Sequence, residues 1–101
     1  MSQRFSSFAE FYPFYLKEHS NINCRRMHFF GTFLVISLIF VFLTTGNWKL
    51  LLFTPIFGYG FAWFGHFYFE KNKPATFPHP LYSLIADFVM FRDILLGKVK
   101  I

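Results

Sequence analysis

The sequence predicts an all-α integral membrane protein: an N-terminal interfacial helix, a two-helix transmembrane hairpin, and a C-terminal interfacial or re-entrant helix. Hydrophobic residues make up 54% of the 101 residues and aromatic residues 25%, whereas charged residues make up only 15%. A soluble chain of this length does not bury so much apolar surface. In addition, two long segments carry almost no charge and are separated by a short polar turn. The length predicts a single domain, residues 1–101.

The N-terminal segment is amphipathic. Residues 3–18 carry phenylalanines and tyrosines at helical spacing with polar residues between them. This pattern is typical of a helix in the membrane interface, and we expect Pro13 to kink it. Glu10 and Pro13 interrupt the apolar run that a cleavable signal peptide needs, so none is predicted. Residues 18–28, EHSNINCRRMH, are polar and basic and predict a loop.

Two apolar segments predict the hairpin. Residues 29–46 contain no charged side chain, and at about 1.5 Å rise per residue they nearly cross a hydrocarbon core of about 30 Å. The following TTGNWK supplies a glycine stop and an interfacial tryptophan. Residues 50–69 have no acidic or basic side chain except His66, which predicts the second crossing.

The C-terminal segment, residues 80–97, is apolar again, with Pro80 suited to a helix start and Gly97 to its end. Its uncharged part is too short for a full crossing and is interrupted by Asp87. An interfacial or re-entrant helix is therefore favoured over a third transmembrane helix.

The basic residues predict the orientation. Only Lys49 lies in the hairpin turn, so both hairpin ends are expected in the cytoplasm, with the chain in a bacterial inner membrane, or in the endoplasmic reticulum membrane of a eukaryote. The basic residues that flank the open end of the hairpin are Arg4, Lys17, Arg25, Arg26, Lys71 and Lys73. We expect membrane lipid as a partner.

Composition disfavours two other classes. The net charge is +5, but the basic residues form no continuous stripe, so no nucleic-acid partner is predicted. Cys24 is the single cysteine, which excludes an intramolecular disulfide, and no CxxC pair suggests zinc. The simplest interpretation of Cys24 is an ordinary thiol at the membrane boundary.

The hairpin brings all four histidines to one membrane depth. His28 opens the first crossing, and His66 lies 16 residues beyond Leu50, about 24 Å along the second. His19 precedes the first crossing and His79 follows the second. Two or three imidazoles with a carboxylate and an open position are typical of a non-haem Fe²⁺ site that activates oxygen. The alternative is that each histidine is a separate interfacial residue.

Two carboxylates accompany the histidines. Glu70 follows His66 by four residues, and a carboxylate at the bilayer edge is costly unless it is paired or ligated. Asp87 follows His79 and Ser83 at spacing four and is a candidate for orienting a metal-bound histidine. Pairing of Asp87 with a basic residue is the structural alternative: Arg25, Arg26 or Lys71. Three glycines of the second crossing are expected to allow close packing on the first: Gly58, Gly60 and Gly65.

Several stretches together resemble a family of small membrane proteins that includes the fungal 2-hydroxy fatty acid dioxygenase of phytosphingosine breakdown. They cover nearly the whole chain: FYPFYLKEHSN, CRRMHFFGT, FAWFGHFYFEKNKPATF and PLYSLIADFVMFRD. The most specific motif is GHxxxEKxxPA, formed by Gly65, His66, Glu70, Lys71, Pro74 and Ala75. Tyr15, His19 and His28 are further matches.

The resemblance implies an Fe²⁺-dependent dioxygenase of fatty acid α-oxidation. Such an oxidoreductase converts a 2-hydroxy fatty acid and oxygen into carbon dioxide and the acid one carbon shorter. The implied iron ligands are His19, His28 and His66. His79 has no histidine counterpart in the fungal enzyme and is a second-tier candidate from its predicted depth alone. Glu70 and Asp87 are the candidate catalytic carboxylates. Four basic residues are candidates for holding the substrate carboxylate: Arg25, Arg26, Lys71 and Lys73.

Two other functions stay open at this point. One is a haem-binding or other metal-binding membrane protein with His28 and His66 as axial ligands. The other is a non-catalytic hairpin that packs against a partner subunit. A homo-oligomer is also compatible with a chain of only 101 residues that has to enclose a lipid tail.

Overall fold

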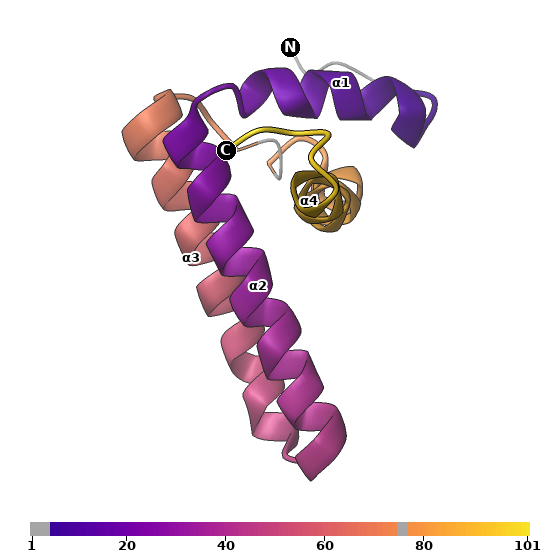
Figure 1. Cartoon of the computed structure of the whole chain (residues 1–101), viewed down its shortest axis with the longest axis vertical. Helices are drawn as coiled ribbons and strands as arrows, with labels where there is room; N and C mark the ends of the chain where they lie inside the picture. The colour runs from indigo at the N-terminus through magenta and orange to yellow at the C-terminus, as the bar shows by residue number, and fades with distance from the viewer. Residues whose placement is uncertain (1–4, 75–76) are drawn as a thin grey trace.

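The computed structural model describes residues 5–74 and 77–101, and all regular secondary structure in this part of the chain is helical. The predicted all-α class is confirmed for these residues. Along the chain the elements are α1 (Phe8–Glu18), α2 (Ile22–Thr45), η1 (Trp48–Phe53), α3 (Thr54–Phe64), η2 (Gly65–Glu70) and α4 (Pro80–Leu95). Figure 1 shows α2 and α3 side by side in a long hairpin, with α1 across its open end and α4 seen nearly end-on.

The first arm of the hairpin begins seven residues earlier than predicted. The side-chain oxygen of Asn21 accepts hydrogen bonds from the backbone N–H groups of Asn23 and Cys24, at 2.8 and 3.3 Å. This cap satisfies two of the free N–H groups at a helix start. The loop predicted over residues 18–28 is therefore wrong for most of its length. His28 consequently lies inside α2 and not at its first residue.

The second arm is one helical run with three successive geometries. It begins as the 3-10 helix η1, continues as α3, and ends as the π-helix η2. The wider π-helical turn shifts the register of side chains relative to an α-helix. Lys71 then adopts a left-handed conformation with φ 58°, which ends the helix and reverses the chain.

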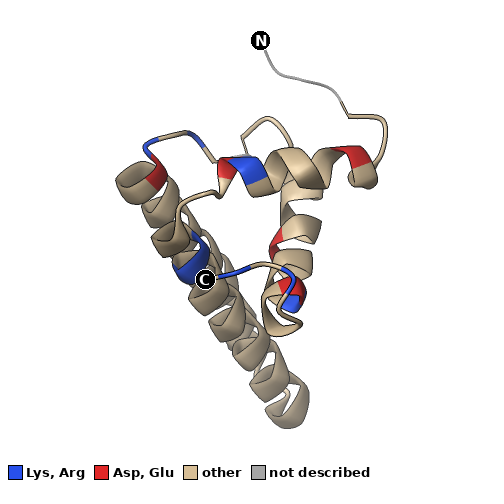
Figure 2. Cartoon of the chain, turned by 45° about the horizontal axis from the view of Figure 1, so that its top comes forward, with Lys and Arg blue, Asp and Glu red and all other residues tan. Residues whose placement is uncertain are grey.

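Two helical runs, Ile22–Thr45 and Trp48–Glu70, are long and apolar enough to cross a membrane. Only 17% of the residues in the apolar window of each are buried inside the chain. A core helix of a soluble protein would be mostly buried, so this exposed apolar surface favours contact with lipid. Figure 2 shows charged residues gathered around α1, α4 and the open end of the hairpin. Arg4 and Ala75, used in the sequence analysis, lie outside the described residues.

Close packing of the two arms depends on glycine. Three glycines face the opposite arm or its side chains: Gly31, Gly58 and Gly65. A Cβ on Gly31 would lie 3.0 Å from the Cβ of Phe61 and 3.2 Å from the carbonyl oxygen of Phe57. A Cβ on Gly60 would meet nothing within 4 Å, so the prediction that Gly60 allows close approach is wrong.

A second layer packs α1 against α4. Phe11 and Tyr15 of α1 are buried against Ala86 and Met90 of α4. The helix begins at Phe8, later than the predicted residue 3, because the Ser7 side chain caps it by accepting from the Glu10 N–H at 3.3 Å. The 16 residues of α4 are fewer than the roughly 20 that a crossing needs. Its placement in the membrane interface stays a prediction.

We predict that Gly31→Ala destabilises the hairpin and that Gly60→Ala does not. Both changes remove the same helical cost of glycine. The new methyl group at residue 31 collides with Phe61, whereas at residue 60 it enters open space. We expect Gly31→Ala to lose about 1–3 kcal/mol of unfolding free energy relative to Gly60→Ala. Reversible unfolding in mixed detergent micelles measures the difference, and equal stability of the two variants would contradict this packing.

Candidate metal centre

Three histidines from three separate elements meet at the open end of the hairpin. His19 is the residue that ends α1, His28 lies in α2, and His66 lies in η2. The Nε2 atom of His19 is 3.0 Å from Nε2 of His28 and 2.8 Å from Nε2 of His66. The three side chains are 0%, 5% and 1% exposed, respectively. The sequence predicts one membrane depth for these histidines, and in the structure their side chains are in direct contact.

The position of His19 follows from the packing of α1. Phe11, Tyr15 and His19 recur at spacing four, so the histidine continues the buried face of the helix. The Tyr15 ring stacks on the His19 imidazole with ring centroids 3.9 Å apart. Arg25 donates from Nε to the carbonyl oxygen of His19 at 2.6 Å. Both contacts fix the chain where it turns from α1 into α2.

The outer nitrogens of His19 and His66 each face an oxygen that only accepts hydrogen bonds. His19 Nδ1 lies 2.6 Å from the carbonyl oxygen of Tyr15. His66 Nδ1 lies 2.7 Å from Oδ1 of Asn72. The amide nitrogen of Asn72 donates to the Glu18 carbonyl oxygen at 3.1 Å, which fixes the orientation of this amide. Both histidines are therefore assigned the tautomer with the proton on Nδ1.

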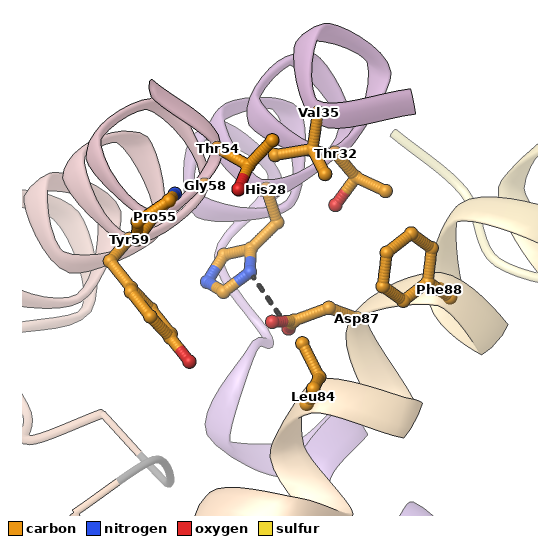
Figure 3. Close-up of a pocket in the computed structure, with 10 residues that line it drawn as sticks. All are labelled: His28, Thr32, Val35, Thr54, Pro55, Gly58, Tyr59, Leu84, Asp87 and Phe88. Atoms are coloured by element: carbon orange, nitrogen blue, oxygen red, sulfur yellow. Dashed lines mark ion pairs between the residues drawn. The ribbon is translucent and has the colours of Figure 1, made fainter. Parts of the chain in front are cut away.

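The Nδ1 atom of His28 also faces an oxygen, in this case one of a carboxylate. Its Nδ1 lies 3.4 Å from Oδ1 of Asp87, which α4 contributes (Figure 3). The Tyr15 hydroxyl donates to the same carboxylate oxygen. A neutral His28 therefore also carries its proton on Nδ1, because a lone pair there would face a carboxylate.

This proton assignment leaves three unprotonated Nε2 atoms that face one another. Lone pairs at 2.8 and 3.0 Å repel each other unless a cation lies among them. Metal-ligating histidines characteristically donate their second ring N–H to a carboxylate or a carbonyl oxygen. The donor set thus fits a metal ion, and the ligand atoms of the three histidines and of Cys24 all lie within 4.8 Å of one another.

Burial determines the protonation states of Tyr15 and His19. Burial, followed by the neighbouring His28 and His66, holds the pKa of His19 well below its ordinary value. His19 is therefore neutral near pH 7 and keeps a free lone pair on Nε2. Burial and the Asp87 carboxylate raise the pKa of the Tyr15 hydroxyl well above its ordinary value. Tyr15 therefore remains a hydrogen-bond donor.

Two candidate residues lie outside the histidine group. Glu70 accepts from the backbone N–H of Asn21 at 2.6 Å and from the Ser20 hydroxyl at 3.4 Å. It thereby ties the end of the second arm to the α1–α2 connection. His79 precedes α4 and packs against phenylalanine rings, the nearest being Phe5 with ring centroids 5.2 Å apart.

The candidate carboxylate-binding residues are spread around the open end of the hairpin. Arg25 is bound to backbone, donating to the carbonyl oxygens of His19 and Lys100. The other three are exposed or largely exposed at the surface: Arg26, Lys71 and Lys73.

Sequence reasoning missed three features of the centre. Asn72 was not identified, because only the π-helix and the reversal at Lys71 return its side chain to His66. The role of the Tyr15 hydroxyl in holding Asp87 has no signal in sequence spacing. Cys24 is buried beside the histidines and belongs to the group that could hold a metal. Its place on the first turns of α2 became visible only with the Asn21 cap.

The geometry disfavours a haem bound between His28 and His66. Their ring centroids are 5.1 Å apart, and His19 Nε2 lies within 3.0 Å of Nε2 in both. A porphyrin that separated the two axial ligands would have to pass through the His19 imidazole.

The fold and the site define a helical protein with a membrane-type hairpin and a buried trihistidine centre. Residues 5–99 match the family model described as 2-hydroxy-palmitic acid dioxygenase Mpo1-like. The chain belongs to this Mpo1-like family, as its motifs indicated. Comparison with curated proteins and with solved structures found no match.

We predict that His19→Ala, His28→Ala and His66→Ala each abolish metal retention, whereas His79→Ala leaves it intact. Each of the first three changes removes one of the converging Nε2 atoms, and the fourth removes a ring packed among phenylalanines. Elemental analysis of detergent-purified protein measures the bound metal per chain, with size-exclusion chromatography as the check of folding. Full metal content in a folded His66→Ala variant would contradict the site.

A second prediction concerns the hydroxyl of Tyr15. Tyr15→Phe removes the donor that holds Asp87 against His28, and loss of such an outer contact typically costs about 10–100-fold in metal affinity. Tyr12→Phe is the matched control, because Tyr12 is on the same helix and donates to Asp93 at 2.8 Å. Competition with a chelator measures both affinities. Equal affinity of the two variants would show that the Tyr15 contact does not support the metal.

Proposed function

We propose that this protein is an Fe²⁺-dependent dioxygenase that shortens a 2-hydroxy fatty acid by one carbon and releases carbon dioxide. The observation that carries the proposal is the convergence of three histidine Nε2 atoms, in residues whose Nδ1 atoms each face an oxygen atom. Membership of a family described as 2-hydroxy-palmitic acid dioxygenase-like supports the substrate class. Imidazole suits iron among several metals, and the oxygen chemistry of the family favours iron.

The proposed reaction balances without an external electron donor. A 2-hydroxy acid, R–CH(OH)–COOH, and one O₂ give R–COOH, CO₂ and H₂O. The bond between the carboxyl carbon and the hydroxyl-bearing carbon breaks. The two carbons together lose four electrons, and O₂ accepts all four.

The chain has distinct tasks in this reaction. His19, His28 and His66 would hold the iron, which supplies activation of oxygen when it is bound. Asp87 faces Nδ1 of His28, and the Tyr15 hydroxyl donates to Asp87 and holds it there, so that the His28 Nε2 lone pair is directed at the centre. The burial of the three imidazoles limits access of water to the reacting atoms.

The surroundings of the centre suit a substrate delivered by a membrane. The centre lies at the end of two helical runs that are apolar enough to cross a bilayer. A fatty acid in the cytoplasmic leaflet has its carboxyl group at head-group depth and its tail among apolar side chains. With both hairpin ends cytoplasmic, the exposed Arg26, Lys71 and Lys73 attract the substrate carboxylate toward the centre. A homo-oligomer stays a prediction.

The proposal predicts oxygen uptake that depends on iron and on His66. Purified protein reconstituted with Fe²⁺ should consume one O₂ and release one CO₂ per 2-hydroxy fatty acid, and His66→Ala should fall to background. The non-hydroxylated fatty acid of the same length is the control, because it lacks the oxidisable C–OH group. If the protein retains iron but turns over no 2-hydroxy fatty acid, the metal site is supported and the proposed reaction is refuted.

A further inference from the structure

A cavity of about 170 Å³ adjoins the histidine centre between α2, α3 and α4 (Figure 3). We call it the groove. Its walls are mostly apolar and include Thr32, Val35, Gly58, Tyr59, Leu84 and Phe88. His28 and Asp87 also line it. On α2 its lining extends from His28 to Val35, seven residues and thus about 10 Å.

The groove adjoins the metal centre, because His28 and Asp87 line it and also line a small cavity among the three histidines. This small cavity is too tight for a water molecule. Ser83 also lines this small cavity, is 2% exposed, and has a buried hydroxyl oxygen with no hydrogen-bond partner. A buried hydroxyl without a partner is unfavourable, so it is suited to a polar group that arrives with a ligand.

The α4 wall of the groove is partly exposed. α4 packs against α1 and α2 and has little contact with α3. Leu84 and Phe88, which line the groove from α4, are 45% and 38% exposed. With the hairpin in a bilayer, as the proposed function requires, a lipid chain can enter the groove past this exposed wall.

We propose that the groove holds the first part of the substrate's acyl chain, with the carboxyl and hydroxyl end at the His28 end of the groove. The occupant is the acyl chain of a 2-hydroxy acid, because a partly exposed apolar slot leads to a polar end, formed by His28 and Asp87, that adjoins the unpartnered Ser83 hydroxyl. The rest of the chain lies in the bilayer. The position of the polar end rests on the proposed function, whereas the position of the acyl chain rests on the shape and apolar lining of the groove.

The test fills the groove with a larger side chain on α4. Leu84→Trp places a larger side chain in the groove, whereas Leu81→Trp, on the same helix and 67% exposed, does not line it. Burial of one methylene changes affinity about fourfold. We expect Leu84→Trp to lower kcat/KM for 2-hydroxypalmitic acid at least tenfold while leaving that for 2-hydroxybutanoic acid and the iron content unchanged. Leu81→Trp should match the wild type. Equal effects of the two variants, or equal loss for both acids, would overturn the assignment.

A second readout does not require turnover. A 2-hydroxy fatty acid with a diazirine in its chain is photolysed with the protein in lipid nanodiscs, and the labelled peptides are mapped by mass spectrometry. We expect labelling of groove residues such as Val35 and Phe88 that excess unlabelled 2-hydroxypalmitic acid and Leu84→Trp both suppress. Labelling that the unlabelled acid does not reduce would contradict binding of the acyl chain in the groove. If the wild-type protein is labelled specifically but shows no turnover, binding in the groove is supported and the proposed reaction is refuted.

Discussion

The structure depends on one constraint: the Nδ1 atoms of three histidines each face an oxygen acceptor, which assigns their protons to Nδ1 and leaves their Nε2 lone pairs facing one another. No pair of these imidazoles can relieve the repulsion by hydrogen bonding without breaking an outer contact or charging a buried ring. A cation relieves it for all three at once. The acceptors come from separate places: a carbonyl one turn back on α1, a carboxylate on α4, and an amide beyond the π-helix.

The fold brings these elements together through a small number of contacts. Gly65 lets η2 approach α2, since a Cβ there would lie 3.1 Å from the Cys24 Sγ and 3.3 Å from the Cys24 Cα. Glu70 accepts from the N–H of Asn21, the residue that caps α2, and so joins the end of the second arm to the start of the first. The α1–α4 layer adds Tyr15 and Asp87. The apolar hairpin supports the centre, and the three histidines meet at its open end.

Much of this arrangement can be predicted from sequence because it depends on long patterns. Charge-free runs predict the two arms, and the short turn between them places His28 and His66 at one level. The remaining details depend on local hydrogen bonding. The Asn21 cap converts a polar stretch into helix, and an i to i+5 turn has no residue pattern that separates it from an α-helix. Asn72 becomes a partner of His66 only through that turn. Its role is therefore visible only in the three-dimensional structure.

The most direct test of the account is X-ray absorption at the iron K-edge of the protein reconstituted with Fe²⁺. The account predicts a first shell of nitrogen and oxygen with the outer-shell scattering of about three imidazoles. His79→Ala should keep all three, whereas His28→Ala, which does not retain the metal, should give no iron signal. The same spectrum reports whether the Cys24 sulfur joins the shell. A spectrum without imidazole scattering would contradict the central claim that the three Nε2 atoms form a metal site.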